Sequence, residues 1–233
     1  MEISGIQKLT LLDYPGELAC TLFTRGCNFT CPFCHNSSLV LLDEKTRADI
    51  IPTDEVLQFL QERYGKIDGV CITGGEPLMQ PDLTQFITSV KSMGYLVKLD
   101  TNGYMPDKLQ QLIDAHLIDY IAMDVKNSEE KYALTVGRKN INFDKIKQSI
   151  EIIKHSGLQY EFRTTAIKEY HSIEDFEKIS ELIGSDTTSY FIQNFIDSGA
   201  VIKDGLHGYT KDELLVYKKI FDDKNIPCEI RGI

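Results

Sequence analysis

Positive charge is scarce in this sequence, and the shortage narrows the classes of function. Its 233 residues carry 25 lysines and arginines against 35 aspartates and glutamates, which gives a formal net charge of −10. Such an acidic balance argues against a nucleic-acid-binding or anionic-membrane surface. No apolar run approaches the ~18 residues that a transmembrane helix needs. The start of the chain, Met1 to Gly5, also lacks the basic and apolar regions of a signal peptide. These absences predict a cytoplasmic protein with no nucleic-acid or membrane partner.

Several motifs of common enzyme classes are also missing. The sequence has no Walker loop, no GxGxxG fingerprint and no Ser-His-Asp arrangement. It has no internal repeat, low-complexity tract or linker, so residues 1–233 are predicted to form one domain. In a reducing compartment its six cysteines are expected to be metal ligands or core thiols rather than disulfides.

Three of these cysteines lie close together. Cys27, Cys31 and Cys34 are separated by three and then two residues. Thiolates at this spacing cannot converge from one regular strand or helix, so we expect a loop wrapped around a ligand. A [4Fe–4S] cluster held by three thiolates would keep one iron open, whereas structural zinc favours two CxxC pairs. We favour the cluster, with zinc and unliganded thiols as alternatives. The other cysteines form no second pair and are interpreted as core thiols: Cys20, Cys71 and Cys228.

Apolar periodicity predicts strands that alternate with helices. Strand-like runs lie at 18–23, 70–72, 95–99, 120–123, 160–165, 190–195 and 228–230. Helical patterns lie at 53–64, 81–93, 106–115, 143–156 and 172–183, and a capping box at 210–213 starts the last helix. Residues 37–52 are expected to be irregular. Strands separated by such helices indicate βαβ units and a parallel sheet, and six units fall short of the eight that close a barrel.

Polar segments follow most of these strands, and ligands of parallel α/β sheets bind at the carboxyl ends of strands. We therefore expect the segments to meet at one rim. Plainer explanations exist for each: a tight turn for the glycines, helix caps for the aspartates and surface ion pairs for the cations. The segments are the cysteine loop, Thr73-Gly74-Gly75-Glu76-Pro77, Asp100-Thr101-Asn102-Gly103, Asp124 with Lys126, and Gln193-Asn194.

These motifs resemble those of the radical S-adenosylmethionine (SAM) superfamily. The CxxxCxxC loop matches its signature, and the segment from Gly74 to Pro77 is similar to its GGEP motif. Three further segments resemble the activases of glycyl radical enzymes, most of all the activating proteins of anaerobic ribonucleoside-triphosphate reductases. They are Asp13-Tyr-Pro15-Gly16, Cys34-His35-Asn36 and Asp100-Thr101-Asn102-Gly103. The resemblance implies a partial (β/α)6 TIM-like barrel, open on one side.

The resemblance also implies the cofactors and their ligands. Cys27, Cys31 and Cys34 would hold a [4Fe–4S] cluster, and SAM would bind its open iron. Asp100, Thr101 and Asp124 match positions that bind a monovalent cation. No catalytic residue is implied beyond the cluster and SAM. The implied SAM-binding residues are Asn36, Thr73, Gly74, Gly75, Glu76, Asn102, Lys126, Arg163, Gln193 and Asn194.

The activity implied is radical generation on another protein. A flavodoxin or ferredoxin would reduce the cluster, SAM would be cleaved to methionine and a 5′-deoxyadenosyl radical, and this radical would take a hydrogen atom from a glycine of an anaerobic ribonucleotide reductase. One alternative is a radical SAM enzyme acting on a small molecule, such as a 7-carboxy-7-deazaguanine synthase, and another is a peptide-modifying radical SAM enzyme. A non-catalytic metal-binding scaffold is the alternative from a different class.

Overall fold

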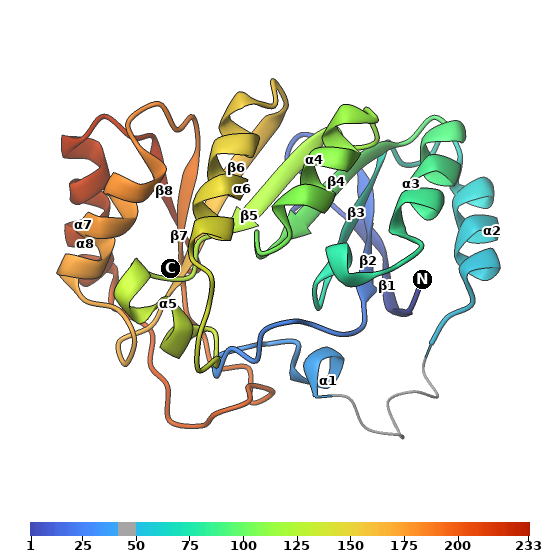
Figure 1. The fold of residues 1–233 in the computed structure, drawn as a ribbon. Helices are drawn as coiled ribbons and strands as arrows, with labels where there is room; N and C mark the ends of the chain where they lie inside the picture. Colours follow the sequence, from blue (N-terminus) through green and yellow to red (C-terminus); the bar gives the residue numbers. More distant parts are fainter. Residues whose placement is uncertain (42–49) are drawn as a thin grey trace. The chain divides into compact units, whose positions relative to one another are not determined.

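The computed structural model describes residues 1–41 and 50–233, which form two compact units (Figure 1). The first unit contains residues 1–28, 38–101 and 107–121. The second contains residues 29–37, 102–106 and 122–233. Strand β5 (Tyr120–Asp124) supplies residues to both. The chain therefore passes between the units several times.

Four consecutive strands are paired in the first unit. β1 pairs antiparallel with β2, whereas β2, β3 and β4 pair in parallel. Register aligns Thr24, the last residue of β2, with Gly74, the last residue of β3. Both strands therefore end at the same level. The strands are β1 (Ile3–Thr10), β2 (Ala19–Thr24), β3 (Gly69–Gly74) and β4 (Leu96–Thr101).

Helices lie between the parallel strands of this unit along the chain. Their apolar residues recur on one face, and this face is the one that is buried. In α3, for example, Leu83, Phe86, Ile87 and Val90 are buried while the intervening polar residues face water. The helical elements are α2 (Thr53–Arg63), the 3₁₀ turn η2 (Pro77–Met79), α3 (Leu83–Ser92) and α4 (Pro106–Asp114).

The strands of the second unit pair in parallel. They are β6 (Gln159–Ala166), β7 (Tyr190–Asn194) and β8 (Cys228–Arg231). α7 and α8 pack beside each other (Figure 1), and Phe176, Tyr217 and Phe221 form an aromatic cluster between them. The helices are α5 (Glu129–Thr135), α6 (Asp144–His155), α7 (Ile173–Ile183) and α8 (Lys211–Asp223).

The predicted strands and the six predicted helices all exist, with ends that differ by a few residues. Both capping boxes, Ser172 with Asp175 and Thr210 with Glu213, are present. β1 and α5 were not predicted, and Ser37–Val40 forms a short helix, α1, within the stretch expected to be irregular. The rest of that prediction, at 42–49, lies outside the described residues. Within the described residues, none of the helices combines the length and apolar character needed to cross a membrane.

Candidate functional site

The glycine-rich turn after β3 is hydrogen-bonded to the segment that leads into the cysteine loop. The Gly75 N–H donates to the Thr24 carbonyl, and the Glu76 N–H donates to the Gly26 carbonyl, each at 2.8 Å. Cys27 is the next residue of the chain. Two motifs separated by almost fifty residues are thus joined backbone to backbone within the first unit.

Only glycine fits this junction. Gly74 has φ of +115°, and a Cβ there would lie 2.4 Å from the Thr24 nitrogen. A Cβ on Gly75 would lie 1.9 Å from the Gly26 carbonyl oxygen. Because both distances are far below van der Waals contact, the close approach of the two backbones requires the glycine pair. The turn is therefore a structural junction, whatever else it binds.

Glu76 has a defined structural task next to that junction. Its side chain is 1% exposed, and its carboxylate accepts hydrogen bonds from the Leu78 N–H at 3.1 Å and from the Thr101 hydroxyl at 2.8 Å. The first bond caps η2, and the second links the turn to the end of β4. Both predicted site residues, Glu76 and Thr101, therefore lie together.

Asp100 lies beside a buried cation that the sequence analysis did not single out. Lys98 is 1% exposed, and its ammonium group forms a salt bridge with Asp100. The Cys71 sulfur lies 3.9 Å from the same ammonium nitrogen. The signal was a lysine inside the apolar run of β4, between Val97 and Leu99. A lysine in a strand buried on both faces needs an anionic partner.

Asp124, Lys126 and Arg163, all predicted site residues, form one ion-paired group in the second unit. Asp124 accepts from the Lys126 ammonium at 2.8 Å and from the Arg163 Nε at 3.0 Å. Burial alone would raise the pKa of Asp124, but the charges of Arg163 and Lys126 outweigh it and hold that pKa well below its usual range. Burial would lower the pKa of Lys126, whereas Asp124 raises it above its usual value.

Two residues extend this group and were not predicted. An oxygen of Glu161, a buried carboxylate 1% exposed, lies 3.6 Å from Arg163 Nη1. Arg231 on β8 grips Glu161 through two hydrogen bonds, at 3.1 and 2.9 Å. Bidentate pairing of this kind fixes geometry as well as charge. The orientation of Arg163 is thus set by carboxylates from β5 and β6.

His171 supports the backbone at Lys126. It is 4% exposed, its Nε2 lies 2.9 Å from the Lys126 carbonyl oxygen, and the Ile167 N–H donates to its Nδ1 at 3.3 Å. The Nδ1 also lies 3.3 Å from the Ile167 carbonyl oxygen, and the carbonyl that faces Nε2 can only accept, so Nε2 is the donor of that bond. Burial lowers the pKa of His171, which keeps the ring neutral. Sequence gave no reason to prefer this histidine over the others.

The cysteine loop is divided between the units, with Cys27 in the first and Cys31 and Cys34 in the second. Cys31 is 8% exposed. Burial raises the pKa of Cys34, and the nearby Lys126 charge opposes this. The Lys126 ammonium also lies 5.9 Å from the centre of the Phe33 ring, inside the loop. Lys126 is therefore the cation near the two thiols of this unit.

The remaining cysteines are core thiols, as predicted. They are Cys20 and Cys71, with no exposed surface, and Cys228, 6% exposed. Burial raises the pKa of both Cys20 and Cys228 to about 12. None of the six cysteines forms a disulfide.

Two predicted amides are used for local structure. The Asn102 side-chain oxygen accepts from the Tyr104 N–H at 3.0 Å. Asn194 donates to the Tyr209 carbonyl at 2.9 Å and accepts from the Tyr209 N–H at 2.8 Å. Gln193 pairs in register with Arg231 at the end of β7.

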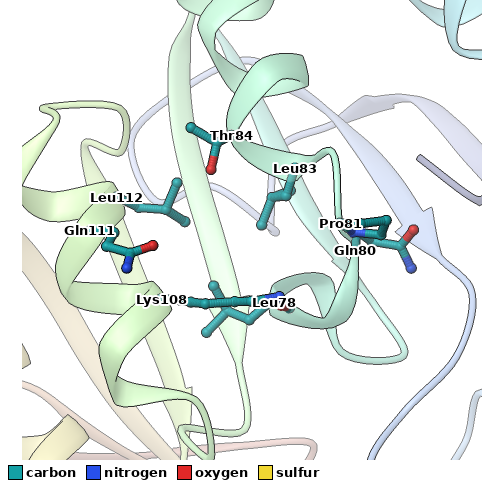
Figure 2. A pocket seen from close by; sticks show the side chains of 8 residues that line it. All are labelled: Leu78, Gln80, Pro81, Leu83, Thr84, Lys108, Gln111 and Leu112. Atoms are coloured by element: carbon teal, nitrogen blue, oxygen red, sulfur yellow. Dashed lines mark hydrogen bonds between the residues drawn. The ribbon is translucent and has the colours of Figure 1, made fainter.

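A small cavity lies between η2, α3 and α4 (Figure 2). Its volume is about 130 Å³, less than the ~300–1,000 Å³ of typical ligand pockets. The Lys108 ammonium at its edge donates to the Leu78 carbonyl at 2.8 Å. This cavity is too small for a nucleoside. The Lys108 hydrogen bond links α4 to η2 and therefore stabilises the position of η2.

The segments that form the candidate site lie within the part of the chain that matches a known protein family. Residues 21–183, which contain the cysteine loop, the glycine-rich turn and the Asp124 group, match the model of the radical SAM superfamily. A Methanocaldococcus jannaschii protein named a "putative glycyl-radical enzyme activating enzyme" is 34% identical over 83% of this chain and 79% of its own length. A pyruvate formate-lyase-activating enzyme of Staphylococcus epidermidis is 26% identical over 78% of this chain and 75% of its own.

Solved structures with similar folds have much lower identity. A radical SAM methyltransferase from Sphaerobacter thermophilus has a TM-score of 0.75 at 14% identity, over 96% of this chain and 68% of its own. QueE from Escherichia coli has a TM-score of 0.61 at 14% identity, over 100% of this chain and 94% of its own. Likeness at this identity shows the fold.

The fold is α/β, with a mostly parallel sheet that is open rather than closed into a complete barrel. The chain belongs to the radical SAM superfamily. Its cofactors are accordingly a [4Fe–4S] cluster with three cysteine ligands and SAM.

The residues present fit these cofactors. No three His, Cys, Asp or Glu side chains in residues 1–41 and 50–233 are already gathered as a metal-binding group, so the fit depends on the donors themselves. The loop offers three thiols that form no disulfide, at CxxxCxxC spacing, whereas the other thiols are buried in the core. Thiolates are the ligands that iron–sulfur clusters take.

Proposed function

We propose that this enzyme activates a glycyl radical enzyme, with an anaerobic ribonucleoside-triphosphate reductase as its partner. The observation that carries the proposal is the 34% identity over most of both chains to a relative named for glycyl-radical enzyme activation. Cys34-His35-Asn36, which closes the cysteine loop, supports it because this segment resembles the corresponding segment of the activases. A flavodoxin or ferredoxin is the proposed electron donor.

In this proposal Cys27, Cys31 and Cys34 ligate the cluster. When bound, the reduced cluster and SAM supply a 5′-deoxyadenosyl radical that takes a hydrogen atom from a glycine. The protein's own residues bind and orient SAM and exclude water from the site. The Lys126 side chain, near both thiols of the second unit, balances part of their negative charge.

Arg163 and Lys126 are the proposed partners of the SAM carboxylate. Both are ion-paired to Asp124, and an arginine can hold a carboxylate through two parallel hydrogen bonds. Glu161 and Arg231 hold the Arg163 guanidinium in place.

The glycine-rich turn is the proposed site for the SAM amino group. Close backbone contact at Gly74 and Gly75 keeps the turn rigid, and the buried Glu76 carboxylate adds negative charge there. The other proposed SAM contacts are Asn36, Thr73, Asn102, Gln193 and Asn194. For the monovalent cation, Asp100, Thr101 and Asp124 remain predictions; Lys98 supplies a positive charge at Asp100.

The experiment that tests the proposal is anaerobic reconstitution with iron and sulfide, followed by incubation with SAM, a reductant and a purified anaerobic ribonucleotide reductase. We expect a glycine-centred radical in the reductase by electron paramagnetic resonance, and none when SAM or reductant is omitted. A reductase whose radical-bearing glycine is replaced by alanine is the matched control. Formation of 5′-deoxyadenosine without a protein radical would favour a small-molecule substrate. Absence of both would overturn the proposal.

A further inference from the structure

The segment between β7 and α8 is a closed loop whose two ends are tied by one side chain. Residues 195–208 follow Asn194, the last residue of β7, and end before Tyr209. The Asn194 side-chain amide donates a hydrogen bond to the Tyr209 carbonyl and accepts one from the Tyr209 N–H. A Cβ on Gly208 would lie 2.1 Å from the Phe195 carbonyl oxygen, so the ends also touch directly. A compact loop of this length with adjoining ends is an Ω-loop.

A second anchor ties the loop to the segment after β6. The His207 N–H donates to one Glu169 carboxylate oxygen at 2.9 Å, and the His207 Nδ1 lies 2.7 Å from the other. The Lys168 N–H donates to the His207 carbonyl at 2.9 Å. Each of these bonds removes freedom from the loop, so its course is fixed at its C-terminal end.

The body of this Ω-loop lies on the cysteine loop. The Lys203 N–H donates to the Pro32 carbonyl at 2.8 Å, and the Ser37 hydroxyl donates to the Ala200 carbonyl at 2.6 Å. Figure 1 shows the orange-red segment after β7 passing next to the light-blue segment that carries these residues. Both segments belong to the second unit.

A ring contact completes the attachment. The rings of His35 and Phe195 stack with centroids 5.4 Å apart and planes inclined by 26°. Phe195 is 3% exposed, so its position is fixed by the core. The three contacts fall at residues 32, 35 and 37 and therefore lie on both sides of Cys34.

We propose that the Ω-loop of residues 195–208 is a clamp that positions the cysteine loop for the cluster, with Ser37 and Phe195 as its positioning residues. This rests on the assignment of Cys31 and Cys34 as cluster ligands under Proposed function. A ligand loop that is held in one conformation loses less entropy when it binds. Mutating residues that orient metal ligands without touching the metal commonly lowers metal affinity by about 10- to 100-fold.

The test measures how fast the reconstituted cluster loses iron to a chelator under anaerobic conditions, without SAM or partner protein. We expect Ser37→Ala and Phe195→Leu each to release iron about tenfold faster than the unmodified enzyme. Ser37→Thr keeps the hydroxyl and Phe195→Tyr keeps the ring, so both should release iron at the original rate. Ser38→Ala, one residue along the same helix, is the matched control.

Thermal unfolding of the cluster-free variants separates clamping from general stability. The proposal requires that Ser37→Ala keep a melting temperature close to that of the unmodified protein while it releases iron faster; Phe195→Leu removes part of a buried ring and is expected to melt somewhat lower. Equal release from Ser37→Ala, Phe195→Leu and Ser38→Ala would overturn it, as would faster release that follows only a lowered melting temperature. Because no radical is measured, failure here is distinct from failure to activate a partner.

Discussion

At the scale of single residues, the site depends on groups that are paired before any ligand arrives. Asp124 lies between Lys126 and Arg163, and Glu161 lies between Arg163 and Arg231. Removing one member of a partly buried pair leaves an uncompensated charge, which costs more than the pair itself contributes. The geometry of Arg163 therefore depends on residues that need not contact SAM.

The first prediction concerns the loop cysteines. Replacement Cys31→Ser exchanges a thiolate for a poor iron ligand, so iron bound after anaerobic reconstitution should fall to a small fraction of the unmodified level. Iron content and visible absorbance measure this directly. Cys228→Ala, in the core at 6% exposure, is the control and should retain the cluster. Equal iron in both variants would contradict the assignment.

The second prediction concerns pH and His171. Its pKa in the folded protein is lowered by burial, so the unfolded chain binds a proton more readily, with a pKa near ~6.5. The free energy of unfolding should therefore decrease as the pH falls from about 7.5 to 5.5, because protonation favours the unfolded state. Urea denaturation at each pH measures the slope.

The control for this slope is His171→Gln, which keeps an N–H donor for the Lys126 carbonyl but cannot titrate. Its unfolding free energy should vary less over the same pH range. If the two proteins showed the same slope, the loss of stability would have to arise at other groups.

At the scale of elements, the junction of β3 with the end of β2 supports both motifs. Thr24 and Gly74 end their strands at the same level, and the turn that follows bonds back to residues 24 and 26. Neither motif keeps its position if the other moves. The sequence distance between them is bridged by α2, which returns the chain to the sheet.

The third prediction tests this junction. Gly75→Ala places a Cβ 1.9 Å from the Gly26 carbonyl oxygen, so the backbones must separate and the free energy of unfolding should fall by roughly 3 kcal/mol. Gly5→Ala in β1 is the matched control, since its Cβ would meet Phe23 at an ordinary 3.5 Å. Chemical denaturation compares the two. Similar stabilities would show that the turn can relax.

At the scale of the whole molecule, each of the two compact units is built from several separate segments of the chain, and no single linker divides them. The chain enters the second unit at residues 29–37 and 102–106 before passing into it at 122. β5 contributes Tyr120 and Ile121 to one unit and its remaining residues to the other. We propose that residues 1–233 act as one domain.

The fourth prediction follows from this sharing. Thermal unfolding should be a single cooperative transition, because neither unit is a continuous stretch of chain that can fold without the other's segments. In calorimetry the measured enthalpy should equal the van't Hoff enthalpy. Two resolved transitions would show that the units are separate domains.

The sequence alone determined the alternation of strands and helices, because apolar periodicity and capping residues are local signals. It also identified the cysteine loop and the glycine-rich turn, whose residue types are unusual enough to be recognised without coordinates. It missed β1, whose residues are mostly half-buried or exposed and therefore carry no clear apolar pattern, and Lys98, whose need for Asp100 arises only from burial.

Only the tertiary structure decided which polar residues meet. Glu161 and Arg231 are seventy positions apart and bond because β6, β7 and β8 are neighbours. The hold of residues 195–208 on the cysteine loop arises in the same way, from contacts between segments more than 150 residues apart. Such contacts depend on strand order and register, and no short stretch of sequence carries that information.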